Sequence, residues 1–131
     1  MKGVYLLIIW LGKEQKIKIG KLGRFNFKKG FYVYTGSALK NLEARVRRHR
    51  RKRKKLFWHI DYLLANKYAK IVNVIGIQTR KRLECDVNKM VLSLPGAKVL
   101  VKGFGSSDCK CKSHLVYFGE RDIRKLAEYN F

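Results

Sequence analysis

Strand-like patterns of hydrophobic and polar residues dominate the first third of the chain. Val4–Leu11 is nearly all apolar with β-branched residues, which predicts a strand covered on both faces. Lys16–Lys21 alternates charged residues with isoleucine, a pattern typical of a half-buried strand. A polar, glycine-containing loop is expected from Gly23 to Gly30, followed by a strand over Phe31–Thr35.

Beyond Leu39 the apolar residues recur at helical spacing. Ser37 or Asn41 is a suitable cap for the first helix. The pattern predicts three helices and one strand: Leu39–Lys54, Leu56–Ala65, Arg80–Leu92 and, as the strand, Lys70–Ile77. After Pro95-Gly96 it predicts a strand, a loop, a strand and a closing helix: Lys98–Val101, Gly103–Asp108, Ser113–Phe118 and Arg121–Glu128. We therefore expect an α/β (α+β) fold, with a small mixed or antiparallel sheet flanked by helices.

The length of the chain indicates the number of domains, and its charge indicates the kind of partner. Without a linker or repeat, residues 1–131 are expected to form one domain. The 31 basic and 9 acidic residues give a net charge of +22, and residues 45–55 hold nine basic residues and no acid. Such one-signed charge favours a polyanionic partner. Anionic membranes compete for this role, and a highly charged thermophilic surface would normally mix both signs. Nucleic acid is the partner that the charge favours.

The cysteines and the apolar run bear on location. Cys85, Cys109 and Cys111 are odd in number, and the last two lie too close in sequence to form a good disulfide. This usage fits a reducing compartment, so we expect a cytoplasmic protein. Val4–Leu11 is too short to span a bilayer, and no small-residue cleavage site follows it. No membrane association is expected.

Three segments resemble the GIY-YIG nuclease superfamily when they are taken in order. They are Gly3-Val4-Tyr5, Tyr34-Thr35-Gly36-Ser37-Ala38, and Arg45 with His49 on the following helix. Later segments are similar to an uncharacterised GIY-YIG-like subfamily that is sometimes fused to an endonuclease-III-type repair glycosylase: Trp58–Leu64, Glu84-Cys85 and Gly103–Leu115. The resemblance implies a motif core over residues 3–92 and a Cys/His loop, strand and helix over 103–131.

The resemblance also implies a metal-dependent endonuclease. Tyr5 would be the general base for the attacking water, Tyr34 would hydrogen-bond near the phosphate, and Glu84 would hold Mg²⁺ or Mn²⁺. Independently of the family, Arg45 suits a bidentate contact with a phosphate, and His49 shares its helix face. The expected catalytic set is Tyr5, Tyr34, Arg45, His49 and Glu84.

Further residues are expected to contact substrate. They lie around the second tyrosine motif, on the basic helix and at the start of the next helix: Gly36, Ser37, Arg47, Arg48, Arg51 and His59. Arg47 points away from His49, which favours Arg45 as the catalytic arginine.

Structural explanations compete with each of these assignments. A single tyrosine is usually a core aromatic with its hydroxyl at the rim, and a phenol is a poor base unless nearby cations lower its pKa. The many arginines are expected to provide that effect. Glu84 also has a structural alternative, as a counter-ion to the basic residues just before it.

The cluster Cys85, Cys109, Cys111 and His114 has three interpretations. It can be a Cys₃His zinc site. Structural zinc usually shows wider pairs such as C-x₂-C, so the spacing favours buried thiols instead. In the third interpretation Ser107, Asp108 and His114 border the active site.

The sequence thus leads to a DNA endonuclease, acting in repair or on branched structures, with a repair glycosylase as a possible partner. One alternative is a nucleic-acid-binding module with a vestigial site, which would serve as a partner or accessory domain. The other is an RNA-binding protein, because a basic helix carries no marker for DNA over RNA.

Overall fold

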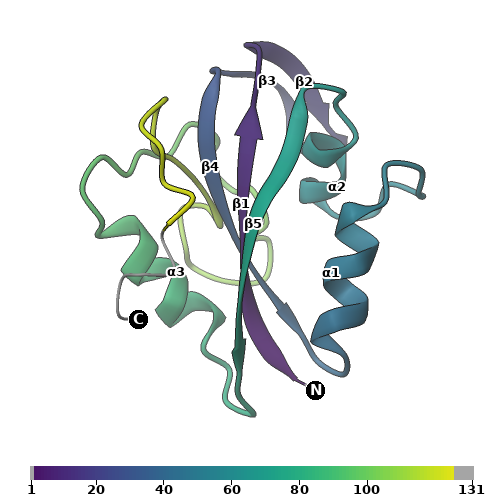
Figure 1. Cartoon of the computed structure of the whole chain (residues 1–131), viewed down its shortest axis with the longest axis vertical. Coiled ribbons are helices and arrows are strands. Elements are labelled where there is room, and N and C mark those ends of the chain that lie inside the picture. The colour runs from purple at the N-terminus through teal and green to yellow at the C-terminus, as the bar shows by residue number, and fades with distance from the viewer. Residues whose placement is uncertain (1, 126–131) are drawn as a thin grey trace.

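The central element of the protein is a four-stranded antiparallel sheet, which the computed structural model shows within the described residues 2–125 (Figure 1). Its strand order is β5-β1-β4-β6. The strands are β1 (Gly3–Leu11), β4 (Gly30–Ala38), β5 (Ala69–Gln78) and β6 (Leu115–Tyr117). With the helices described below, this is the mixed α+β fold that the sequence predicts.

A second sheet pairs β2 (Gln15–Ile19) with β3 (Gly23–Phe27) across a short 3₁₀ turn. The predicted loop from Gly23 to Gly30 is therefore wrong over most of its length. Phe25 and Phe27 alternate with polar residues, and Phe27 is buried in the core, so this segment is a half-buried strand. β2 ends before Lys21 because Gly20 has a φ of +48°, which turns the chain.

Helices cover both faces of the central sheet (Figure 1). α1 (Leu42–Arg50) and α2 (His59–Leu64) pack on the face that carries Tyr5, Tyr32 and Tyr34. α3 (Glu84–Leu92) packs on the opposite face. Both faces of β1 are consequently buried, as its apolar sequence predicts. Among the described residues, no helix has the length and apolarity to cross a membrane.

All three helices are shorter than the sequence predicts. α1 starts at Leu42 because the Asn41 side chain accepts a hydrogen bond from Ala44 N at 2.9 Å. It ends at Arg50, where Lys54 Nζ hydrogen-bonds the last-turn carbonyl oxygens and the basic run leaves the helix. α2 starts at His59, because the Asp61 carboxylate accepts hydrogen bonds from the backbone nitrogens of Phe57 and Trp58 just before the helix. α3 starts at Glu84, and acidic residues in its first turn interact favourably with the helix dipole.

The C-terminal region has less regular structure than predicted. Of the strand expected over Lys98–Val101, only Lys98 pairs with β6, through a bridge to Tyr117. The helix expected over Arg121–Glu128 is not formed at 121–125, and its remaining residues lie outside the described part of the chain. Arg124 N donates to the Asp122 carboxylate, a local turn that competes with helix formation.

Candidate active site and metal cluster

The Tyr5 side chain is placed by two glycines on the neighbouring strands. In the sheet register Tyr5 is opposite Gly36 on β4 and Gly76 on β5. A Cβ atom at Gly36 would overlap the Tyr5 ring, so this position requires glycine. The ring lies across the sheet toward α1 and is 1% exposed.

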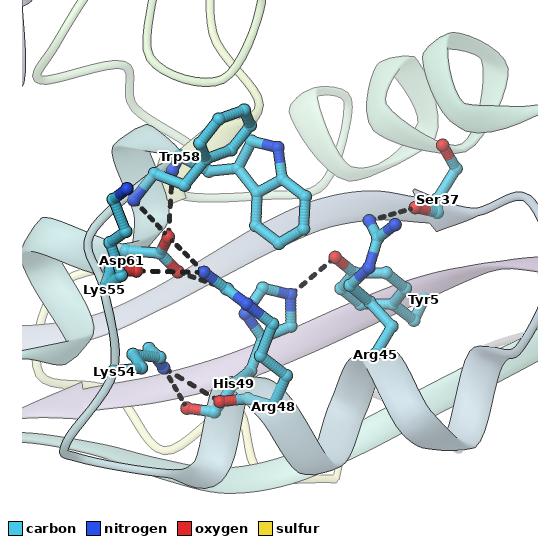
Figure 2. A network of polar contacts seen from close by, with 10 residues as sticks. Tyr5, Ser37, Arg45, Arg48, His49, Lys54, Lys55, Trp58 and Asp61 are labelled. Carbon is cyan, nitrogen blue, oxygen red and sulfur yellow. Dashed lines mark hydrogen bonds and ion pairs between the residues drawn. The ribbon is translucent and has the colours of Figure 1, made fainter.

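Helix α1 brings Arg45 and His49 to the Tyr5 hydroxyl, one turn apart on the same face (Figure 2). The Tyr5 hydroxyl and His49 Nε2 are 2.7 Å apart, and the Arg45 guanidinium lies beside the phenol, where its charge acts on the phenol pKa. The Tyr34 ring centroid lies 6.3 Å from those of Tyr5 and His49. Four of the five predicted catalytic residues therefore meet at one place.

Burial sets the protonation state of this pair. It raises the pKa of Tyr5 to about 12, although the positive charge of Arg45 acts in the opposite direction. It likewise places the pKa of Tyr34 well above the ordinary value. The expectation that arginines depress these phenol pKa values is therefore wrong, since desolvation outweighs them. Burial, with a smaller effect from Lys54, lowers the pKa of His49 to about 4. At neutral pH a neutral phenol faces a neutral imidazole.

Arg45 is held at the rim of the site by two contacts. Its Nη1 donates to the Ser37 carbonyl oxygen at 2.9 Å, and its guanidinium carbon lies 4.4 Å from the centre of the Trp58 ring. The guanidinium is thus oriented beside the Tyr5 hydroxyl (Figure 2). No contact with an acidic side chain is formed by this arginine among the described residues.

Arg48 has a different, structural partner. Its Nη1 and Nη2 donate to the two oxygens of the buried Asp61 at 2.8 and 2.9 Å. The same carboxylate accepts hydrogen bonds from the Phe57 and Trp58 backbone nitrogens. Burial acts to raise the pKa of Asp61, but the bonds from Arg48 and these nitrogens outweigh it and lower that pKa. Arg48 therefore fastens the segment between α1 and α2.

Two lysines of the basic run also serve the fold. Lys52 Nζ donates to the carbonyl oxygens of Leu64, Asn66 and Ala69, and Lys54 Nζ closes the end of α1. The other exposed basic residues of this region, which are available to phosphates, are Arg47, Arg50, Arg51, Arg53 and Lys55.

Glu84, in the first turn of α3, lies at the edge of a groove of about 460 Å³. Its Oε2 is 2.8 Å from His114 Nδ1, and Ser37 lines the same groove. Burial acts to raise the pKa of Glu84, but the interactions with His114, Ser37 and Arg45 outweigh burial and lower that pKa. Asp108 and a group of basic residues line the same groove: Lys2, Arg80, Lys81 and Arg82.

The predicted cluster Cys85, Cys109, Cys111 and His114 converges in space. Its potential ligand atoms all lie within 4.8 Å of one another. His114 is buried and turns Nε2 toward Cys109 Sγ, at 3.3 Å, and Cys85 Sγ, at 4.0 Å. The four residues form a group that can hold a metal ion, and its three sulfurs favour zinc over magnesium.

His59 supports the site indirectly. Its Nδ1 accepts a hydrogen bond from Gly105 N at 2.8 Å. Gly105 has a φ of +67° and packs against the Tyr34 ring, so His59 fixes the loop that covers Tyr34.

The comparison with protein families agrees with the extent of this fold. A family model described as a domain of unknown function, DUF123, matches residues 4–130. The chain belongs to this DUF123 family. No curated protein and no solved structure matches it significantly. Since the DUF123 description carries no activity, the resemblance to GIY-YIG nucleases stays a prediction.

Sequence reasoning missed two residues that organise this DUF123 site. Trp58 stacks against both Arg45 and Arg48, and Asp61 neutralises Arg48 from inside the core. Asp61 is one of few acidic residues in a strongly basic chain and lies among the apolar residues of a helix. An acid in that position could have predicted a buried ion pair with one of the arginines.

Proposed function

We propose that this protein is a metal-dependent endonuclease that hydrolyses DNA phosphodiester bonds. The observation that carries the proposal is the position of the Tyr5 hydroxyl. It lies between a neutral imidazole, His49, and a guanidinium, Arg45, with the Glu84 carboxylate nearby. A proton acceptor, an anion-binding group and a metal-ligating carboxylate are the groups that phosphodiester hydrolysis requires.

Arg45 is the group that would bind the scissile phosphate. It has no carboxylate partner among the described residues, and Trp58 and the Ser37 carbonyl leave its remaining N–H groups free for an incoming anion. A phosphate held there lies directly beside the Tyr5 hydroxyl. Negative charge that develops on the phosphate in the transition state would be stabilised by the same guanidinium.

Tyr5 and His49 would move the proton together. With a pKa near 12, the phenol is a weak acid that reacts only if its own proton has a destination. The lone pair on His49 Nε2 supplies one at 2.7 Å. As water attacks phosphorus, its proton passes to the Tyr5 oxygen and the Tyr5 proton passes to His49, while the bond to the leaving oxygen breaks.

Glu84 fits a Mg²⁺ or Mn²⁺ ion by its chemistry. It and Asp108 bring carboxylates, and Ser37 brings a hydroxyl, to one groove, and such oxygen donors suit these ions. An ion held there would polarise the phosphate and offset its charge. For the separate cysteine cluster we propose zinc, because thiolates and imidazole are its preferred ligands.

The surface around the site matches a nucleic acid. Exposed basic residues lie on α1 and in the segment that follows it, and further basic residues line the groove at Glu84. Phe57 is 73% exposed next to this basic region and contacts Trp58 edge-on. An exposed aromatic ring beside phosphate-binding groups can stack on an unpaired base, which favours branched or damaged DNA and a role in repair beside a glycosylase.

One observation favours a second candidate, a nucleic-acid-binding module without activity. Tyr5 and Tyr34 are both buried, and their pKa values are raised rather than lowered. A vestigial site would keep the basic surface and lose turnover, on DNA or RNA.

Cleavage of a DNA panel with and without Mg²⁺ or Mn²⁺ separates the two candidates. The panel contains duplex, nicked, branched and abasic DNA, with matching RNA. Arg45→Ala should lower the cleavage rate about 100-fold, because one preorganised cationic contact to the transition state is lost. Arg50→Ala, which changes an exposed arginine on the same helix, is the matched control and should keep the wild-type rate at saturating DNA.

Three results are decisive for this assay. Metal-dependent cleavage that Arg45→Ala abolishes supports the nuclease. Tight, salt-sensitive binding without cleavage of any substrate supports the binding module. Equal loss of activity in both arginine variants would show that Arg45 acts only through surface charge.

A further inference from the structure

The cysteine cluster and the candidate catalytic carboxylate share one histidine. His114 Nε2 faces the thiols, while its Nδ1 is 2.8 Å from Glu84 Oε2. We infer that Cys85, Cys109, Cys111 and His114 bind one structural Zn²⁺, and that Glu84 orients the histidine ligand of this ion.

The separations of the four ligand atoms fit the size of a tetrahedral zinc site. With Zn–S bonds near 2.3 Å and Zn–N bonds near 2.0 Å, tetrahedral ligand atoms lie roughly 3.5–3.8 Å apart. The two sulfur-to-Nε2 distances, 3.3 Å for Cys109 and 4.0 Å for Cys85, lie on either side of that range. All four ligand atoms lie within 4.8 Å of one another, so small side-chain adjustments complete the site.

The ligands come from separate parts of the fold. Cys85 lies in the first turn of α3, Cys109 and Cys111 lie in the irregular loop before β6, and His114 directly precedes that strand. Zinc bound here would tie the loop to α3. Beside the cluster, Asn88 Nδ2 of α3 already donates a hydrogen bond to Ser113 O at 2.8 Å.

The contact between Glu84 and His114 matches the environment of a zinc-bound imidazole. A histidine that binds metal through Nε2 carries its proton on Nδ1, and that N–H commonly donates to a carboxylate. The backbone oxygen of Thr35 lies 3.2 Å from the same nitrogen. Both ring nitrogens of this buried side chain therefore have defined partners, which fixes the imidazole between the thiols and α3.

The consequence for catalysis rests on the proposed function, whereas the metal centre itself does not. Glu84 would have two tasks: one oxygen orients His114, and the carboxylate also lines the groove next to Ser37. Occupation of the zinc site would then hold this carboxylate at the edge of the phosphodiester site. Removal of zinc should release both the loop and Glu84.

Metal analysis of the purified chain tests the inference. Protein prepared under reducing conditions without chelators should contain about one zinc per chain, and Cys109→Ser and Cys111→Ser should lose it. Replacement with cobalt(II) should give the intense absorption of a tetrahedral thiolate site. Glu84→Gln should keep the site but weaken its zinc affinity about 10- to 100-fold in a chelator competition. Asp86→Asn, an exposed acid in the same turn of α3, should bind zinc like the wild type.

Absence of zinc and of the cobalt spectrum from wild-type protein with a folded circular dichroism signal would overturn the inference. Equal zinc affinity in Glu84→Gln and Asp86→Asn would overturn the role given to Glu84. Neither readout depends on DNA. A zinc-loaded protein that cuts no substrate would refute the proposed nuclease and leave the metal centre supported.

Discussion

At the scale of single residues, Tyr5 and His49 share one short hydrogen bond, and burial acts on them in opposite directions. It raises the pKa of the phenol and lowers that of the imidazole, so both are uncharged at neutral pH. His49 Nδ1 is buried and has no hydrogen-bond partner among the described residues, which adds to the cost of a charged ring. Both groups are therefore uncharged before the proposed proton transfer begins.

The low pKa of His49 predicts a pH-dependent stability. The pKa is about 4 in the folded protein and near 6.5 in the unfolded chain, so the unfolded state binds the proton first as pH falls. Stability present above pH 6.5 should decrease toward pH 4, by about 2–3 kcal/mol at pH 4.5. The His49→Gln variant has no imidazole to titrate, so its free energy of unfolding should fall less between pH 7 and pH 4.5. Urea unfolding of both proteins at pH 7 and 4.5 measures the difference, and an equal loss in both would contradict a neutral buried His49.

At the scale of elements, the segment between α1 and α2 is organised by polar contacts rather than by an apolar core. Asp61 joins Arg48 to the Phe57 and Trp58 backbone, and Lys52 joins the basic run to the carbonyl groups after α2. Trp58 is thereby held where it stacks on Arg45. The candidate phosphate-binding arginine consequently depends on an ion pair that does not contact substrate.

Asp61→Ala should therefore destabilise the fold by about 3 kcal/mol at pH 7, because it removes one partner of a buried ion pair. Glu120→Ala breaks an exposed pair with Lys29 at 3.5 Å and should cost less than about 1 kcal/mol. The pKa of Asp61 is depressed, so its contribution should disappear as pH falls below the ordinary aspartate value near 4. Urea unfolding compares the variants. Similar losses at pH 7 would show that Asp61 is no more than a surface counter-ion.

Local patterns predict some elements of this protein and miss others for identifiable reasons. The strands that contain Val4–Leu11 and Phe31–Thr35 follow from continuous apolar sequence. The strand Gly23–Phe27 was missed because glycine and charge at its ends hid its alternating phenylalanines. The early end of the helix after Asn41 depends on Lys54, a tertiary contact that no local pattern contains.

In the candidate site, too, the sequence predicts some features and misses those that depend on the folded structure. Arg45 and His49 were placed by helical spacing together with a family resemblance, and their shared face is confirmed. The direction of the Tyr5 pKa was wrong, because the sequence gives charge but not the depth of burial. The spacing of Cys109 and Cys111 argued against a metal site, yet Cys85 reaches them from α3 through the fold.

At the scale of the whole molecule, the net charge of +22 is distributed between structural and exposed groups. Arg48, Lys52 and Lys54 are engaged in the fold, whereas Arg51 and Arg53 are exposed. Exposed basic residues lie on the helix of Arg45 and in the segment after it, and a second set lines the groove at Glu84. A nucleic acid bound at the candidate site would therefore meet basic residues from both regions.

The double variant Arg51→Ala/Arg53→Ala should weaken DNA binding and reduce the slope of log K against log salt by about 2, because two phosphate contacts are lost. Lys13→Ala, at the opposite end of β1 from Tyr5, should change neither affinity nor slope appreciably. Fluorescence anisotropy with labelled DNA over a series of salt concentrations measures both. Equal effects from the two variants would indicate binding by net charge alone.

The most direct test of the catalytic account is the single-turnover cleavage rate of Tyr5→Phe on DNA that the wild type cuts. Tyr32→Phe is its control, since Tyr32 lies buried on the same sheet face and its hydroxyl donates to the Lys28 carbonyl oxygen. Loss of the Tyr5 hydroxyl should lower the rate at least 100-fold with DNA affinity unchanged, and Tyr32→Phe should retain the wild-type rate. Wild-type cleavage by Tyr5→Phe would contradict the proton path through Tyr5 and His49.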